Sequence, residues 1–98
     1  MNVVETGHIY KLNNTESSQA QELIFINRDA GNLIYDGTTN EEVLKVLIDR
    51  LKYLNMKCPC RENSIVITKL EESLMWLNRR TELRIAQGVE TKDLPHVS

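Results

Sequence analysis

The architecture follows from residues 44–54, which read Leu44-Lys45-Val46-Leu47-Ile48-Asp49-Arg50-Leu51-Lys52-Tyr53-Leu54. The leucines of this run recur at spacings of three, four and three residues, so they share one face of an α-helix. Thr39 and Glu42, just before the run, have the spacing of a capping box. The pattern predicts a helix over residues 40–56. We expect this helix to end before Cys58-Pro59-Cys60, because proline cannot donate a backbone hydrogen bond.

A second apolar seam follows the Cys-Pro-Cys loop. Its members are Ile67, Leu70, Leu74 and Leu77. Their spacing predicts another helix, over residues 62–87. Because the loop between the two helices is short, we expect them to pack as an antiparallel hairpin.

The remaining segments carry weaker patterns. Residues 1–16 have no sustained period and predict an arm. Apolar residues at helical spacing predict a helix over residues 18–35, although Gly31 weakens it by about 1 kcal/mol relative to alanine. These apolar residues are Leu23, Ile26, Ala30 and Leu33. Residues 88–98 predict a loosely held tail. We therefore expect a single all-α domain over residues 1–98, with the arm and first helix packed on the hairpin.

Both hairpin helices also carry apolar residues away from their seams. These are Val43, Val46, Ile48, Ile65, Val66, Met75, Trp76 and Leu83. A helix that is apolar on more than one face must be buried on more than one face. In so short a chain the simplest cover is another copy of the chain, so we expect a compact homo-oligomer.

The composition excludes several classes of protein. Ninety-eight residues suit one small domain, and a net charge of −2 provides no general attraction to DNA, RNA or an anionic membrane. No apolar run approaches the ~20 residues that span a bilayer. Residues 1–6 lack the basic and apolar regions of a signal peptide. We expect a cytoplasmic protein without a nucleic-acid or membrane partner.

Residues suited to catalysis or metal binding are sparse. Cys58 and Cys60 are separated by one residue, and His8 and His96 lie near opposite ends, so no set of ligands has zinc-site spacing. The sequence has no Gly-rich phosphate loop, Gly-x-Ser-x-Gly or His-Glu-x-x-His motif. We expect a protein that is not an enzyme and that holds no metal or cofactor.

Three further features favour a structural interpretation. Glu71 and Glu72 would point about 100° apart on a helix, which indicates a solvated face and not a carboxylate pair. Trp76 fits a packed core or interface better than a base-stacking site. The pair Arg79-Arg80 fits a favourable interaction with the negative end of its helix.

Two groups of residues have chemistry that suits a nucleotide. The first is residues 8–11 with Arg28, where the ring of Tyr10 could stack on a purine and basic groups could pair with phosphate. The second is residues 61–64 with Thr68, where an arginine, two hydroxyls and the free backbone N–H groups of a helix start could bind an anion.

Residues 61–78 carry a resemblance to a known family. They read Arg61-Glu62-Asn63-Ser64-Ile65-Val66-Ile67-Thr68-Lys69-Leu70-Glu71-Glu72-Ser73-Leu74-Met75-Trp76-Leu77-Asn78. This run resembles the signature of the hairpin domain shared by the anti-CBASS cyclic-nucleotide sponges and the Thoeris antagonists of tailed phages. An arm, one helix and a hairpin resemble the anti-CBASS branch more closely. Residues 79–82 depart from the small residues that the family has there.

The resemblance implies a fold, an assembly and two ligand pockets. It implies compact helical oligomers, hexamers in the family, that bind signal nucleotides without cleaving them. The residues that match the cyclic-dinucleotide pocket are Tyr10, Lys11 and Arg28. The residues that match the cyclic-trinucleotide pocket are Arg61, Ser64 and Thr68.

The implied function is phage counter-defence in the cytoplasm of an infected bacterium. The chain would sequester cyclic dinucleotides, such as cyclic GMP-AMP, and cyclic trinucleotides, so that the CBASS effector stays inactive. One alternative is sequestration of a Thoeris signal of the cyclic ADP-ribose type. Another is a helical protein-interaction module with no nucleotide ligand.

Overall fold

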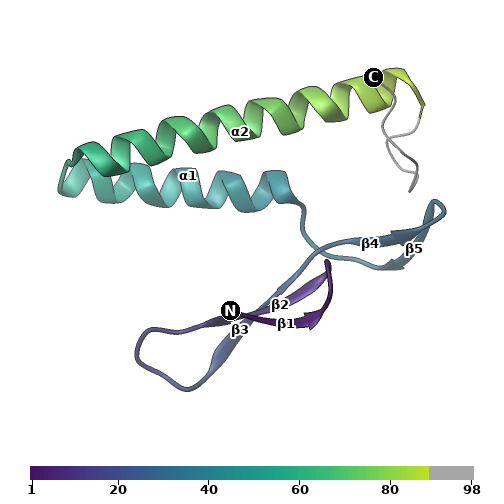
Figure 1. Ribbon diagram of the computed structural model, residues 1–98, viewed down its shortest axis with the longest axis horizontal. Coiled ribbons are helices and arrows are strands. Elements are labelled where there is room, and N and C mark those ends of the chain that lie inside the picture. Colours follow the sequence, from purple (N-terminus) through teal and green to yellow (C-terminus); the bar gives the residue numbers. More distant parts are fainter. Residues whose placement is uncertain (89–98) are drawn as a thin grey trace. The chain divides into compact units, whose positions relative to one another are not determined.

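A computed structural model of the chain describes residues 1–88, which form two compact units (Figure 1). Residues 1–39 contain the strands, which are β1 (Asn2–Glu5), β2 (Ile9–Asn13), β3 (Ala20–Ile24), β4 (Asn27–Asp29) and β5 (Asn32–Tyr35). Residues 40–88 contain the helices, which are α1 (Asn40–Lys57) and α2 (Arg61–Ala86). Of the tail expected over residues 88–98, residues 89–98, with His96 among them, lie outside the described residues.

The expectation of an all-α fold is wrong, because residues 1–39 are built from strands. The expected arm contains β1 and β2, and the helix expected over residues 18–35 is instead β3, β4 and β5. Ala30 and Gly31 both have positive φ angles, of 50° and 85°. Two successive left-handed residues suit a tight turn between antiparallel strands, and they cannot continue a right-handed helix.

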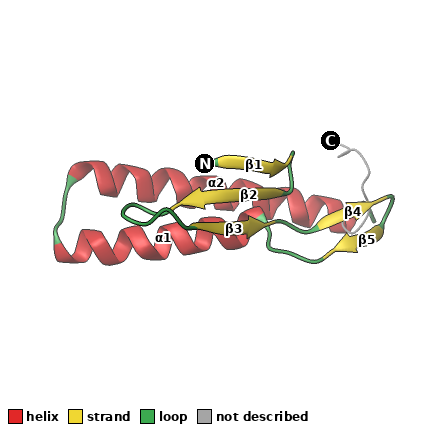
Figure 2. Cartoon of the chain, turned by 90° about the horizontal axis from the view of Figure 1, so that it is seen from below, coloured by secondary structure: helices red, strands yellow, loops and turns green. Residues whose placement is uncertain are grey.

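The larger sheet has three antiparallel strands in the order β1-β2-β3 (Figure 2). Tyr10 in the central strand pairs with Val3 of β1 and with Leu23 of β3. Paired residues point to the same side of a sheet, so these three side chains share a face. Lys11 pairs with Glu22 on the opposite face. The register of β1 shifts between Val3 and Glu5, which marks a bulge.

A close backbone crossing joins the larger sheet to the segment after β5. The N–H of Thr38 donates to the carbonyl oxygen of Ile24 at 2.8 Å, and the N–H of Ile26 donates to that of Thr38 at 2.9 Å. A Cβ atom on Gly37 would lie only 2.5 Å from the carbonyl carbon of Phe25. Position 37 therefore has no room for a side chain.

The helical unit is an antiparallel hairpin, as the sequence predicts (Figure 1). The bounds of both helices lie within one residue of the predicted ones. The seam of α1 differs by one position, since Leu47 is 44% exposed whereas Ile48 is 8% exposed. The less exposed face of α1 runs through positions 44, 48 and 51 instead of 44, 47 and 51. Both sets combine steps of three and four residues, so both are compatible with one face of a helix. Neither helix is apolar enough over a sufficient length to cross a bilayer.

Hydrogen bonds at the closed end of the hairpin fix where α2 begins. The side-chain oxygen of Asn55 accepts from the N–H of Cys60 at 3.0 Å, and its amide nitrogen donates to the hydroxyl of Ser64 at 3.2 Å. The sulfur of Cys60 accepts from the N–H of Asn63 at 3.4 Å. Asn55 therefore ties α1 to the loop and to the first turn of α2.

Very little apolar surface is buried in the single chain. Among residues 1–88, only Ile48 and Ile67 are buried apolar residues. Several apolar side chains predicted to need cover are more than half exposed, including Val46 at 66%, Met75 at 55% and Trp76 at 62%. Isolated exposed apolar residues are common, but a repeated set along both helices indicates a surface that something else covers.

Replacing Gly37 with alanine should destabilise the strand unit. The new methyl group would press against the backbone of Phe25, which cannot move away as a side chain could. We expect a loss of about 1–3 kcal/mol in the free energy of unfolding, visible as a fall of several degrees in Tm by circular dichroism.

Gly7→Asn is the matched control, because Gly7 has open space around it and asparagine tolerates its positive φ. A Gly37→Ala protein as stable as the wild type would show that the crossing is looser than described.

Candidate functional site

One face of α2 forms a hollow lined by basic, hydroxyl and apolar side chains. It has a volume of about 300 Å³ and is lined by Arg61, Ser64, Ile65, Thr68 and Lys69. These positions follow the spacing i, i+3, i+4, i+7, i+8, which keeps them on one side of a helix. We call this surface the α2 hollow. It brings together Arg61, Ser64 and Thr68, the three residues matched to a cyclic-trinucleotide pocket.

The α2 hollow carries positive charge that the described chain does not neutralise. Arg61 and Lys69 form no ion pair with any acidic group of residues 1–88. No acidic side chain lines the hollow. A phosphate entering it would therefore meet two cations without first having to displace a carboxylate.

The hydroxyls of the α2 hollow have well-defined partners. Thr68 Oγ1 donates to the carbonyl oxygen of Ser64 at 3.1 Å. Ser64 Oγ donates to the carbonyl oxygen of Cys60 at 3.3 Å, and accepts from Asn55. Both hydroxyls are thus held in place by the helix, and Ile65 supplies an apolar patch beside them.

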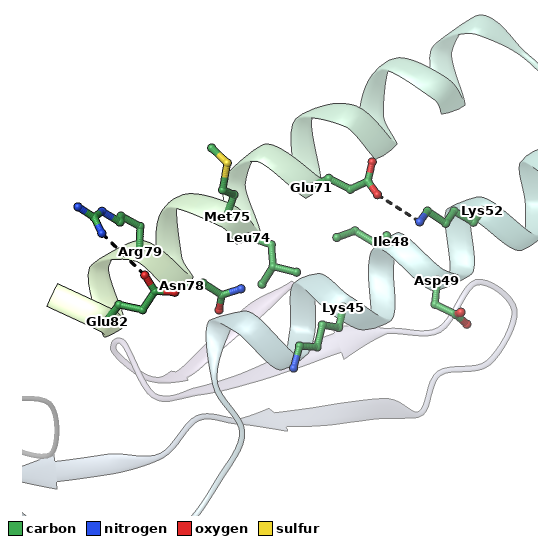
Figure 3. Close-up of a pocket in the computed structure, with 10 residues that line it drawn as sticks. All are labelled: Lys45, Ile48, Asp49, Lys52, Glu71, Leu74, Met75, Asn78, Arg79 and Glu82. Atoms are coloured by element: carbon green, nitrogen blue, oxygen red, sulfur yellow. Dashed lines mark ion pairs between the residues drawn. The ribbon is translucent and has the colours of Figure 1, made fainter. Parts of the chain in front are cut away.

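A larger hollow of about 730 Å³ lies between the two helices (Figure 3). Its apolar floor includes Ile48 and Leu74, and its charged side chains are Lys45, Asp49, Lys52, Glu71, Arg79 and Glu82. Three are basic and three are acidic, so the hollow has no surplus charge.

The basic groups of the interhelical hollow are also occupied. Lys52 pairs with Glu71 at 3.1 Å, Lys45 with Glu42 at 3.0 Å, and Arg79 with Glu82 at 3.9 Å. A phosphate would have to compete with these carboxylates for each cation. Although it is smaller, the α2 hollow is the better candidate for an anionic ligand.

The residues matched to a cyclic-dinucleotide pocket are spread over the strand unit. Tyr10 and Lys11 are neighbours on β2 and therefore point to opposite faces of the sheet. Arg28 lies on β4 in the second sheet, not on a helix as expected. The half-buried Tyr10 ring meets the Phe25 ring edge to face, with centroids 5.9 Å apart and planes at 86°. Lys11 and Tyr10 therefore do not lie on the same face of the sheet.

A second aromatic contact links the two ends of the strand unit. The rings of His8 and Tyr35 meet edge to face with centroids 6.4 Å apart, and the Tyr35 hydroxyl donates to a Glu5 carboxylate oxygen at 2.7 Å. Partial desolvation, and then the hydrogen bond to Glu5, raise the pKa of Tyr35 above its ordinary value of 10.0. The phenol therefore stays protonated to a higher pH in the folded chain.

Sequence reasoning missed two residues at these sites. Lys69 lies eight residues after Arg61, and counting helical turns from Arg61 would have placed it on the same face. Phe25 was assigned to a helix, whereas it follows β3, donates its backbone N–H to the carbonyl oxygen of His8 at 2.8 Å and contacts the ring of Tyr10.

The described chain lacks a cluster of metal ligands. Among residues 1–88, no group of three or more His, Cys, Asp or Glu side chains lies close enough to hold a metal ion. Cys58 and Cys60 are free and exposed at the hairpin loop. The α2 hollow itself is lined by two cations, two hydroxyls and one apolar side chain.

Comparison with known proteins identifies relatives of the chain. The sequence model of the family described as Acb2/Tad1, hairpin domain, matches residues 20–82. Thoeris anti-defense 1 of Bacillus phage SBSphiJ7 is 52% identical over 56 residues, which are 56% of this chain and 39% of that protein. The chain thus spans about two fifths of the length of this curated relative. The matched residues 20–82 contain the whole α2 hollow, whereas Tyr10 and Lys11 lie before them.

The ionisation of Tyr35 provides a direct check on the strand unit. Because its pKa is raised on folding, the stabilisation from the protonated phenol is fully present below pH 10 and is lost as the pH rises through the folded pKa. The difference in phenolate absorbance between the wild type and Tyr35→Phe should therefore have its midpoint above pH 10. In a Glu5→Gln background we expect the midpoint to fall towards 10. A midpoint at or below 10 in the wild type would contradict the raised pKa of Tyr35, and an unchanged midpoint in the Glu5→Gln background would contradict the contribution of Glu5.

Proposed function

Because the chain belongs to the Acb2/Tad1 hairpin-domain family, we propose that it is a phage anti-defence protein that binds a nucleotide signal and does not cleave it. The observation that carries the proposal is the α2 hollow, where Arg61 and Lys69 face a surface without acidic groups. The hollow lies within the residues matched by the family. Phosphates are the charged groups that all such signals share.

The side chains of the candidate sites support binding without chemistry. The α2 hollow contains no histidine, cysteine or carboxylate that could act as a base or nucleophile. Its two hydroxyls donate to helix carbonyls, and no base lies beside them to activate them. A ligand held there is stabilised by charge and shape, and its phosphodiester bonds stay intact.

The first candidate ligand is a cyclic oligonucleotide of the CBASS type. Arg61, Ser64 and Thr68 would hold a cyclic trinucleotide in the α2 hollow. For a cyclic dinucleotide, Tyr10 would provide a stacking surface and Arg28 a phosphate partner. Lys11 is the weakest member of that set, because it projects from the face of β2 opposite Tyr10. Retention of these ligands in the cytoplasm of the infected bacterium would keep the CBASS effector inactive.

The second candidate ligand is a Thoeris signal of the cyclic ADP-ribose type. It is favoured by the curated relative, which is a Thoeris anti-defence protein. The preference for the anti-CBASS branch rested partly on a helix at residues 18–35, and that segment is β-structure. Both classes of ligand contain two or more phosphates, so the α2 hollow suits either.

The ligand sites would be completed by self-assembly. The α2 hollow is open in the single chain and cannot enclose a ligand on all sides. The exposed apolar residues of both helices offer the surface for contact with other copies. We propose a homo-oligomer, with the hexamer implied by the family resemblance as its expected size. In such an assembly several α2 hollows could face one ligand.

Calorimetric titration of cyclic tri-AMP, cyclic GMP-AMP and cyclic ADP-ribose isomers tests the proposed function. We expect at least one ligand to bind with a dissociation constant in the nanomolar range, on the order of −12 kcal/mol, and to be recovered intact by mass spectrometry after the protein is denatured. Arg61→Ala should abolish binding of the trinucleotide. The pair Tyr10→Ala with Arg28→Ala should abolish binding of the dinucleotide and leave the oligomer unchanged.

Recovery of linear or hydrolysed nucleotide would make the protein an enzyme. Failure of every nucleotide to bind would instead favour a protein-interaction module. Arg80→Ala serves as a control, because Arg80 is exposed on α2 and lies outside the α2 hollow.

Sedimentation velocity tests the proposed assembly. We expect the wild type to sediment as an oligomer at micromolar concentration. Trp76→Ala should weaken assembly at least tenfold, because buried tryptophans contribute strongly to protein interfaces. Its exposure of 62% means that the single chain should be little affected by the substitution. A wild-type protein that sediments as a monomer would contradict the proposal.

A further inference from the structure

The two cations of the α2 hollow lie at its opposite ends. Arg61 and Lys69 are eight residues apart, which on an α-helix corresponds to about 12 Å along the axis. Ser64, Ile65 and Thr68 lie between them. Both side chains are long, so they can hold one phosphate between them or pair with two phosphates of the same ligand.

Lys69 differs from the other lysines of the hairpin that line a hollow. Lys45 and Lys52 border the interhelical hollow, and each lies within 3.1 Å of a carboxylate oxygen. Lys69 has no such partner among residues 1–88. Its ammonium group can therefore pair with a ligand phosphate without breaking an existing ion pair.

The hydroxyls between the two cations are poorly suited to bind phosphate. Thr68 and Ser64 direct their protons to the carbonyl oxygens of the preceding turns, at 3.1 and 3.3 Å. They present lone pairs to the outside, and phosphate oxygens are themselves acceptors. The phosphates must then be held by Arg61 and Lys69, while the hydroxyls accept from ligand donors such as ribose hydroxyls or base amino groups.

We infer that Lys69 is a second phosphate-binding residue of the α2 hollow and acts together with Arg61, while the hydroxyls between them accept from hydrogen-bond donors of the ligand. This inference rests on the proposed function, since it assigns a role within the same site. It adds a residue outside the set that the family resemblance assigns, and it gives the cations and the hydroxyls of the hollow different roles. Arg61 and Lys69 bind the phosphates, and Ser64 and Thr68 bind the sugar or base.

The test is titration of cyclic tri-AMP into the full-length chain and its Lys69→Met variant, which removes the charge and keeps an unbranched side chain. We expect binding to weaken on the order of ten- to a hundredfold, the effect of losing one charged hydrogen bond. Lys69→Arg should restore most of the affinity. The affinity of Lys69→Met should also depend less steeply on salt concentration, which a purely structural role would not explain.

Lys45→Met is the matched control, because Lys45 is an exposed hairpin lysine outside the α2 hollow. Circular dichroism establishes that each variant is folded. If Arg61→Ala weakens binding and Lys69→Met does not, the inference about Lys69 is wrong and the proposed function stands. If the wild type binds neither cyclic tri-AMP nor any other nucleotide offered, both are wrong.

Discussion

The packing of α1 against α2, fixed at its closed end by Asn55, determines the geometry of the helical unit. Asn55 bonds to the backbone of Cys60 and to the hydroxyl of Ser64, so a residue of α1 decides where α2 starts. Every group of the α2 hollow lies within the first nine residues of that helix. The orientation of the Ser64 hydroxyl therefore depends on a contact between helices and not on α2 alone.

Charge distinguishes the two hollows of the hairpin more clearly than size does. The interhelical hollow has more than twice the volume, yet each of its cations already has a carboxylate within 4 Å. Such exposed pairs contribute little stability, but they remove the attraction for an incoming anion. The α2 hollow keeps its positive charge because its lining includes no acidic residue. The position of the acidic side chains thus decides which of the two hollows keeps a surplus of positive charge.

The helices could be predicted from the sequence because their apolar spacing persists over several turns and ends at a proline loop. Residues 18–35 could not, because Leu23, Ile26, Ala30 and Leu33 fit a helical period by coincidence. The positive φ angles at Ala30 and Gly31 form a turn, so this segment folds as strands and not as a helix. The phase of the α1 seam, with Ile48 buried in place of Leu47, depends on the partner helix. Among the site residues, Arg61, Ser64 and Thr68 came from a sequence signature, whereas Lys69 required the helix face itself.

The bulge in β1 also limits how the strand unit can associate. A three-stranded sheet presents an outer strand edge on which further strands can be added, and β1 forms one such edge. The shifted register between Val3 and Glu5 interrupts the regular row of backbone donors and acceptors along it. The proposed function, binding of a nucleotide signal without turnover, would require the chain to accumulate to the concentration of that signal. An irregular outer strand favours dispersion over fibril growth at such concentrations.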